Sequence, residues 1–200
     1  MWVKQDKTII FEGAQGSMLD IDHGTYPFVT SSSTTAGGLS SGLGIGPKHI
    51  DSILGITKAY TTRVGEGPFP TELFDANAEE LAKVGHEFGA TTGRPRRCGW
   101  LDLKALESIM FINSVSNLCI TKLDVLDGFK DIKVCIDYDD DEQPVYKTFA
   151  GWEEDTSNVR SFDGLPKAAQ NYISYIEETL DCPVGIVSVG PSRDQTIYKD

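Results

Sequence analysis

Apolar residues along the chain form short runs that are bounded by glycine or polar residues. The run at 118–121 ends at Lys122, and the run at 183–189 ends at Gly190 and Pro191. Continuous or alternating apolar runs of this length are typical of strands that are buried on one or both faces. Strands are predicted in this way at residues 8–11, 59–64, 118–121, 132–138, 145–149 and 183–189.

Other segments carry apolar residues three and four positions apart, which is the spacing of one helix face. It is clearest at 170–180, and the same spacing predicts helices at 49–58, 77–88 and 101–112. Asn77 is the expected N-cap of one helix and Asp102 lies near the start of another. Strands that alternate with helices predict an α/β fold, with a mainly parallel sheet flanked by helices.

The composition describes an acidic globular chain. Of 200 residues 40% are hydrophobic, and 18 Lys and Arg face 30 Asp and Glu, which gives a net charge of −12. This charge disfavours nucleic acid and anionic membranes as partners. It also means that a nucleotide site needs a local cluster of cationic side chains.

The chain shows no targeting signal and no cysteine motif. It has neither an apolar leader nor a run of about twenty apolar residues, so a cytoplasmic location is expected. The cysteines are far apart in the sequence, which predicts reduced, buried thiols rather than a metal site or a disulfide framework. They are Cys98, Cys119, Cys135 and Cys182.

The segment Thr121-Lys122-Leu123-Asp124 follows an apolar strand, where open α/β sheets bind ligands. A carboxylate at Asp124 can accept hydrogen bonds from N1–H and the 2-amino group of guanine, a donor pair that adenine lacks. The Lys122 stem can lie over the purine face. A surface ion pair is the simpler alternative.

Ser188-Val189-Gly190 ends the last predicted strand in the same manner. Backbone N–H groups at this turn are candidates for the other edge of a bound base. A turn that merely terminates the strand is equally compatible with the pattern.

The segment Ala90-Thr91-Thr92-Gly93-Arg94-Pro95-Arg96-Arg97 is a local exception to the acidic composition. Arginines beside hydroxyl groups and a glycine suit bidentate capture of carboxylate or phosphate. The alternative is a solvated basic patch.

Three further segments carry residue types that occur in ligand sites. Gln15, between small residues, offers an amide donor and acceptor for a purine. Residues 24–46, rich in Gly, Ser and Thr, indicate either a linker or a phosphate-binding loop. Asp20, Asp22 and His23 are spaced too closely for a convincing metal site, and 42–49 lacks the Lys-Ser/Thr ending of a Walker A motif.

Taken together, six segments strongly resemble the adenylosuccinate synthetase family over nearly the whole chain. They are Phe11 to Gly16, Leu19 to Pro27, Gly67 to Glu72, Ala90 to Arg97, Thr121 to Gly128 and Ser188 to Pro191. The resemblance implies GTP-dependent ligation of IMP and L-aspartate to adenylosuccinate in purine biosynthesis, through 6-phosphoryl-IMP.

The resemblance also implies roles for individual residues. It assigns IMP to Gln15, Thr30, Val64 and Arg94, with Val64 lining the pocket through its backbone. It assigns L-aspartate to Ala90, Thr91, Thr92, Gly93, Arg94, Pro95 and Arg96. It assigns GTP to Arg96, Lys122, Leu123, Asp124, Ser188, Val189 and Gly190.

The family's glycine-rich phosphate loop, general base, general acid and Mg²⁺ ligands match no position here. We therefore expect residues 1–200 to be the C-terminal portion of one larger, P-loop-NTPase-like domain, the guanine-binding half, whose full enzyme is a homodimer. No catalytic residue and no metal ligand is expected in this chain, which alone should not turn over. A GTP-binding module, an inactive paralogue and a structural fragment are the alternatives.

Overall fold

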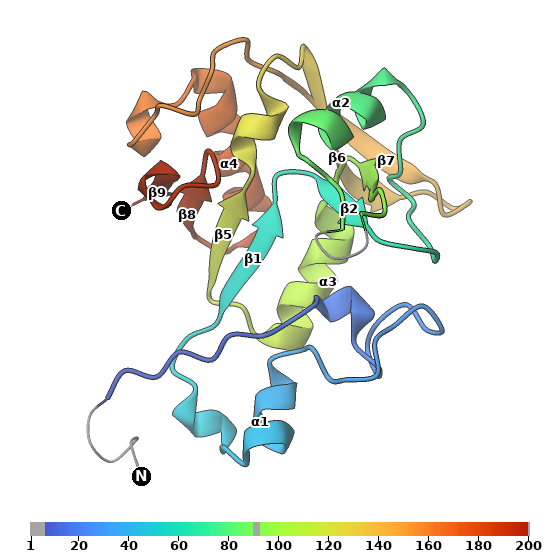
Figure 1. The fold of residues 1–200 in the computed structure, drawn as a ribbon, viewed down its shortest axis with the longest axis vertical. Coiled ribbons are helices and arrows are strands. Elements are labelled where there is room, and N and C mark those ends of the chain that lie inside the picture. The colour runs from blue at the N-terminus through green and yellow to red at the C-terminus, as the bar shows by residue number, and fades with distance from the viewer. Residues whose placement is uncertain (1–6, 90–92, 200) are drawn as a thin grey trace.

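The principal sheet is four-stranded. The computed structural model describes residues 7–89 and 93–199. The strand order is β1-β5-β8-β9, with β1 (Leu54–Lys58), β5 (Asn117–Thr121) and β8 (Val184–Ser188) parallel and β9 (Thr196–Tyr198) antiparallel (Figure 1). The carboxyl ends of β5 and β8 therefore lie side by side.

Two smaller sheets complete the strands of the described residues. One pairs β4 (Leu101–Asp102) in parallel with β6 (Asp131–Tyr138), which in turn pairs antiparallel with β7 (Pro144–Ala150). The other pairs β2 (Thr61–Arg63) antiparallel with β3 (Arg97–Gly99). The α/β prediction is confirmed, but the sheets are mixed rather than mainly parallel. Short turns between β6 and β7, and between β8 and β9, allow antiparallel pairing without a crossover.

The helices pack around these sheets. The α-helices are α1 (Gly37–Leu43), α2 (Ala76–Val84), α3 (Leu103–Asn113) and α4 (Lys167–Leu180). Short 3-10 helices occupy Ser17–Leu19, Pro47–His49, Leu123–Leu126, Phe162–Gly164 and Arg193–Gln195. Helix α3 packs on β6 and on α4, α4 also contacts β7, and α2 packs on β3. None of the helices in the described part of the chain is long and apolar enough to cross a membrane.

Helix α4 closes the core with one apolar face. Tyr172, Ile173 and Ile176 are fully buried, at the three- and four-residue spacing of that face. The Tyr172 ring packs edge-on against Phe149, with 5.7 Å between ring centroids. Its hydroxyl donates to the Ala59 carbonyl oxygen at 2.7 Å, so this buried phenol is both packed and hydrogen-bonded.

Most predicted elements are confirmed, with small shifts of their ends. Helix α2 is capped by Asp75 and not by Asn77, since the Asp75 carboxylate accepts from two backbone N–H groups. Asp102, which was expected near the start of a helix, is the N-cap of α3 and accepts from Ala105 N. All four cysteines are buried and free, and burial raises the pKa of Cys98 and of Cys135 to about 11.

Two predictions of secondary structure are wrong. Residues 49–58 are not a helix, because 54–58 form β1 and pair with β5 from Leu54–Asn117 to Lys58–Thr121. Residues 8–11 form no strand, and Ile10 is 87% exposed. An extended segment becomes a strand only when a neighbour completes its hydrogen bonds, and among the described residues this segment has no such neighbour.

The carboxylate of Asp20 organises residues 17–35, which include the start of the Gly-, Ser- and Thr-rich segment. This part of the segment is therefore not a loose linker. Asp20 is 1% exposed, and its Oδ1 accepts from the N–H groups of Asp22 and His23. Its Oδ2 accepts from those of Thr34 and Thr35 at 2.6 and 3.0 Å. Burial alone would raise the pKa of Asp20, but these four bonds outweigh it and hold the pKa at about 2.

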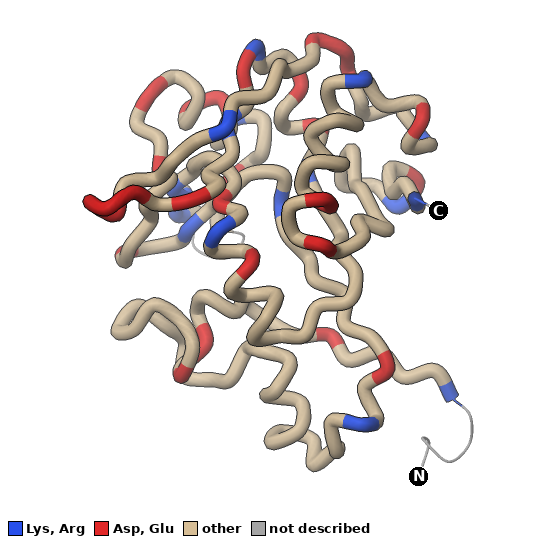
Figure 2. The backbone as a smooth tube through the Cα atoms, turned by 180° about the vertical axis from the view of Figure 1, so that it is seen from behind, with Lys and Arg blue, Asp and Glu red and all other residues tan. Residues whose placement is uncertain are grey.

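Acidic residues outnumber basic ones, 30 to 18, and four of them follow one another at the end of one hairpin. The tip between β6 and β7, residues 139–142, projects as a compact acidic group (Figure 2). Asp139 shapes this turn by accepting from the N–H groups of Asp141 and Gln143. The turn is thus a solvated end of the hairpin, distant in sequence from the candidate ligand loops.

Replacing Asp20 with Asn is expected to destabilise the protein by about 2–3 kcal/mol, because an amide cannot accept all four backbone bonds of a buried carboxylate. Since the pKa of Asp20 is lowered to about 2 on folding, its contribution is complete above about pH 4 and is lost as the pH falls to about 2. Urea unfolding between pH 2 and pH 7 measures both effects.

The matched control is Asp22→Asn in the same turn, where the side chain is exposed. Equal losses of stability for the two variants would contradict the role assigned to Asp20.

Candidate functional site

The turn after β5 presents a buried carboxylate oxygen that has no partner within the described residues. Lys122 adopts the left-handed region with a φ of 60°, and Leu123 behind it is fully buried. Asp124 follows, and its Oδ1 is buried without a hydrogen bond. Burial raises the pKa of Asp124 above its ordinary value. A buried acceptor without a donor is costly, so this oxygen points to a ligand with N–H or O–H groups.

The second predicted base-binding turn lies on the neighbouring strand. Ile120 of β5 pairs with Val187 of β8, so the turns that follow these strands share one edge of the sheet. The Ser188 hydroxyl donates to the Gly190 carbonyl oxygen at 3.0 Å. The Val189 N–H donates to the Gln195 carbonyl oxygen at 2.9 Å, so in this structure it serves the turn itself.

Asp127 connects residues 152–156 to the turn that carries Asp124. Its Oδ1 accepts from the Trp152 indole N–H at 2.5 Å, and its Oδ2 accepts from the Thr156 N–H at 2.8 Å. Trp152 and Thr156 are both almost fully buried. Residues 152–156 are thereby fixed to the turn that holds Asp124.

The arginines predicted as an anion cluster have separate partners. Arg97 makes a two-pronged ion pair with Glu72 and donates to the carbonyl oxygens of Gly65 and Gly67. Arg96 donates from Nη1 to Oε2 of Glu87 at 2.8 Å. Arg97 thus joins β3 to the segment after β2, while Arg96 lies at the base of the predicted aspartate loop.

That loop is closed by its own backbone. Gly89 N donates to the Arg94 carbonyl oxygen and Gly93 N to that of Gly89, both at 2.8 Å, while Phe88 and Pro95 form an isolated bridge. Gly93 has a φ of 63°, a conformation that glycine adopts without strain. The predicted ligands Ala90, Thr91 and Thr92 lie outside the described residues.

Hydrogen bonds hold the loop that carries Thr30, one of the predicted IMP residues. Thr30 N donates to the Leu19 carbonyl oxygen at 2.7 Å. Arg63, which precedes the predicted residue Val64, donates from Nη2 to Thr25 Oγ1 at 2.7 Å. Gln15 is exposed at a φ of 61°, and strained backbone of this kind is frequent at ligand sites.

A charge cluster around Glu87 was missed from the sequence. Oε1 of Glu87 accepts from Lys58 Nζ at 2.8 Å, from the Tyr60 hydroxyl at 2.5 Å and from Lys122 Nζ at 2.9 Å. Its side chain is fully buried, and although burial alone would raise its pKa, these bonds lower it to about 2. The only sequence signal was an acidic residue immediately before a Gly- and Thr-rich loop.

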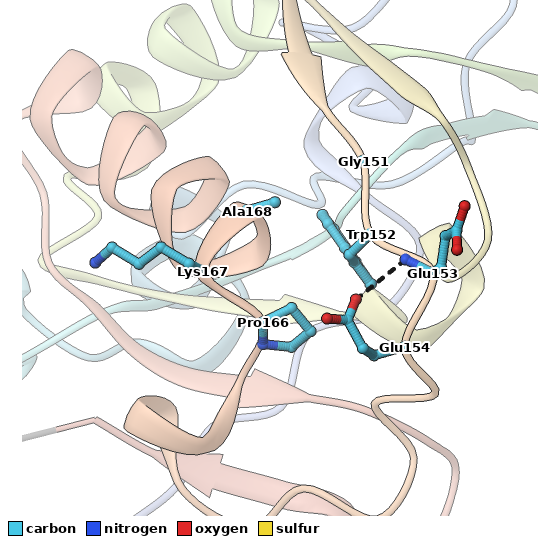
Figure 3. A pocket seen from close by; sticks show the side chains of 7 residues that line it. All are labelled: Gly151, Trp152, Glu153, Glu154, Pro166, Lys167 and Ala168. Carbon is cyan, nitrogen blue, oxygen red and sulfur yellow. Dashed lines mark hydrogen bonds between the residues drawn. The ribbon is translucent and has the colours of Figure 1, made fainter.

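A cavity of about 560 Å³ lies between residues 151–154 and the start of α4 (Figure 3). It is lined by Gly151, Trp152, Glu153, Glu154, Pro166, Lys167 and Ala168. None of the predicted ligand residues lines it, and the Glu154 carboxylate is engaged with the Glu153 N–H. In the described part of the chain, no three His, Cys, Asp or Glu side chains are grouped as a metal site.

A family model described as adenylosuccinate synthetase matches residues 1–197. The chain belongs to the adenylosuccinate synthetase family. It is 57% identical over 206 residues to the adenylosuccinate synthetase of Psychrobacter sp. (strain PRwf-1) and 56% identical over 211 residues to that of Marinomonas sp. (strain MWYL1). These matches take in 96% and 97% of this chain but 48% and 49% of the relatives. The chain thus spans about half the length of the curated relatives it matches.

Solved structures agree with this family. A fully ligated adenylosuccinate synthetase from Plasmodium falciparum superimposes with a TM-score of 0.96 at 44% identity, over 99% of this chain and 51% of that one. The succinoaminodeoxyadenylate synthetase of cyanophage S-2L, solved with dGMP and dATP, matches with a TM-score of 0.59 at 17% identity, over 93% of this chain and 45% of that one. At that identity the second match supports the fold alone.

Replacing Asp127 with Ala is expected to lower the free energy of unfolding by about 2 kcal/mol, because it leaves the buried indole N–H of Trp152 without an acceptor. Thermal unfolding and the tryptophan emission wavelength report the change. Asp131→Ala, at an exposed position of β6, is the control. A stable Asp127 variant with unchanged emission would refute the anchoring role.

Proposed function

We propose that this chain forms the guanine-, IMP- and aspartate-binding part of an enzyme that ligates IMP and L-aspartate at the expense of GTP. GTP would phosphorylate the 6-oxygen of IMP, and the aspartate amine would then displace that phosphate to give adenylosuccinate, GDP and phosphate. Family membership supports this reaction for the full-length protein, whose relatives are about twice as long. The proposal includes one larger P-loop-NTPase-like domain, of which this chain is the C-terminal portion, and a homodimer of that protein.

The buried, unpartnered Oδ1 of Asp124 carries the guanine assignment. Guanine presents N1–H and a 2-amino group on one edge, and a carboxylate at the end of β5 suits that pair. Lys122 and Leu123 precede it on the same turn, and Ser188, Val189 and Gly190 end the adjacent parallel strand. A base between the two turns would meet the carboxylate on one edge and polar backbone on the other.

The remaining ligand assignments rest on the resemblance and on the cationic surroundings. L-aspartate is proposed to bind at Ala90, Thr91, Thr92, Gly93, Arg94, Pro95 and Arg96. IMP is proposed at Gln15, Thr30, Val64 and Arg94, and Arg96 also faces GTP. A chain that is otherwise strongly acidic can bind anionic ligands only where cationic side chains are clustered. The arginines of this loop form such a cluster in the sequence, which favours anionic ligands there.

Neither Asp20 nor Asp127 offers an unused oxygen to a magnesium ion. Both oxygens of Asp20 accept from four backbone N–H groups, and both oxygens of Asp127 accept from Trp152 and Thr156. The roles that we propose for this part of the chain are therefore binding and orientation of the three substrates.

Asp124→Asn is expected to remove most of the preference for GTP over ATP, which we put at about a hundredfold from the cost of unpaired buried donors and acceptors. The change should weaken GTP binding and leave ATP binding weak. Burial raises the pKa of Asp124, so this carboxylate takes up its proton at a higher pH than an ordinary aspartate does. As the pH is lowered, GTP affinity should therefore begin to fall at that higher pH. Calorimetric titration with both nucleotides measures these effects.

The control is Asp155→Asn, which removes a nearby negative charge that raises the pKa of Asp124. This variant should keep the selectivity and shift the acid loss of GTP binding to lower pH. If wild-type protein binds GTP and ATP equally, the guanine assignment is wrong.

A protein of these 200 residues alone is expected to form no adenylosuccinate from GTP, IMP and L-aspartate, since no position matches the family's general acid, general base or magnesium ligands. A coupled assay that follows product absorbance tests this. Turnover by residues 1–200 would disprove it, whereas a full-length protein that binds GTP without turnover would support a GTP-binding module instead.

A further inference from the structure

The side chain of Gln195 joins two segments that lie 38 residues apart in the sequence. Gln195 ends the short 3-10 helix Arg193–Gln195, which lies between β8 and β9. Its Oε1 accepts from the Ser192 N–H at 3.1 Å, and its Nε2 donates to the Ser157 carbonyl oxygen at 3.0 Å. One end of the amide therefore closes the turn after β8, while the other end holds residue 157.

The proposed base-binding turn after β8 lies against this amide. A Cβ added to Gly190 would come within 2.3–2.4 Å of the Cδ, Oε1 and Nε2 atoms of Gln195, far closer than van der Waals contact. The Val189 N–H also donates to the Gln195 carbonyl oxygen at 2.9 Å. Gln195 thus supports the turn at residues 188–190 through both its side chain and its backbone.

The segment that receives the Gln195 amide is fixed to the turn after β5. The Asp127 carboxylate accepts from the N–H and the hydroxyl of Thr156, and Thr156 is fully buried. Ser157 follows directly, so the carbonyl oxygen that Gln195 binds is one residue from this anchor. Asp127 is in turn bonded to Asp124, because its N–H donates to the Asp124 carbonyl oxygen at 3.2 Å. A continuous path of bonds therefore leads from one base-binding turn to the other.

The sheet alone does not determine how far apart the two turns stand. The paired residues of β5 and β8 end at Ile120 and Val187, before either turn begins. An exposed ion pair between Arg160 and Asp194, at 3.1 Å, adds a second link between the same segments. Exposed ion pairs contribute little free energy, because solvent screens them and both side chains lose freedom. The partly buried Gln195 amide is therefore the stronger of the two links.

We propose that Gln195 is a positioning residue that sets the distance between the two base-binding turns, and with it the selectivity for guanine over hypoxanthine. This inference rests on the proposed function, which places guanine between these turns. Asp124 can accept from both N1–H and the 2-amino group only while the opposite edge of the base is held by residues 188–190. In a rigid site, a base without the 2-amino group leaves a buried acceptor unpaired and binds weakly.

Loosening the turn after β8 lowers this selectivity for a physical reason. When residues 188–190 can move away, the base tilts and water reaches Asp124, whose Oδ1 is buried without a partner among the described residues. Guanine then loses much of its second hydrogen bond, whereas hypoxanthine has less to lose. The Kd of the guanine nucleotide should therefore rise more than that of the hypoxanthine nucleotide.

The experiment uses the full-length protein and two variants, Gln195→Glu and Gln195→Met. Glutamate keeps the acceptor for the Ser192 N–H but sets a carboxylate oxygen against the Ser157 carbonyl oxygen, so it breaks only the link between the segments. Methionine has a similar length, removes both bonds and adds no charge.

Calorimetry measures the Kd of GDP and of inosine diphosphate (IDP), with saturating IMP present to keep IDP out of the IMP site. Thermal unfolding checks that each variant is folded. We expect wild type to bind GDP at least about tenfold more tightly than IDP, and both variants to show less than about a threefold difference.

Asp194→Asn is the matched control. It lies on the same short helix and removes the exposed ion pair with Arg160, but it leaves the Gln195 amide in place. This variant should keep the wild-type ratio of the two Kd values. If Gln195→Glu does not fold, Gln195→Met carries the test alone.

The proposal is overturned if wild type does not distinguish GDP from IDP, or if the folded Gln195 variants keep the wild-type ratio. Loss of the ratio in Gln195→Glu but not in Gln195→Met would also overturn it, since the added charge and not the broken link would then be the cause. Failure of the proposed function has a different signature, because wild type would then bind ADP as tightly as GDP.

Discussion

The buried carboxylate of Glu87 and its four donors join the end of β1, the turn after β5 and the residue that precedes β3. The donors are Lys58 at the end of β1, Tyr60 just after it, Lys122 at the start of the turn after β5, and Arg96. A lone buried carboxylate would be strongly unfavourable, and so would three cations packed together. Each charge therefore stabilises the position of the others, and the loops are fixed relative to the sheet.

The same device recurs at other points of the chain. Asp20 organises residues 17–35 through backbone N–H groups, Asp127 fixes 152–156, and Glu72 joins β3 to the segment after β2 through Arg97. Loops rich in Gly, Ser and Thr bury little apolar area, so charge-assisted hydrogen bonds take over the role that apolar packing has in the core. Asp124 differs from these carboxylates because one of its oxygens is buried with no partner among the described residues.

The parallel pairing of β5 and β8 explains why two distant segments lie at one edge of the sheet. Residues 121–124 and 188–190 are far apart in sequence, but both follow strands of the same direction in adjacent positions. The connection between these strands runs through β6, β7 and α4, and α4 buries Tyr172, Ile173 and Ile176 in the core. A rigid core thus supports turns whose own sequences have little tendency to adopt one conformation.

The sequence alone accounts for the elements whose patterns are local, α2, α3, α4, β5 and β8, and for the polar turns that bound them, but it misplaced the N-cap of α2 at Asn77 instead of Asp75. It also determined the family, through motifs that recur in one order. Only the tertiary structure decided that 54–58 pair as β1, that 8–11 remain unpaired, and that Glu87 and Asp20 are buried at the centre of loops. These strand pairings and buried charges depend on hydrogen-bond partners from distant segments. Neither helical spacing nor local charge predicts which side chains come into contact in the folded chain.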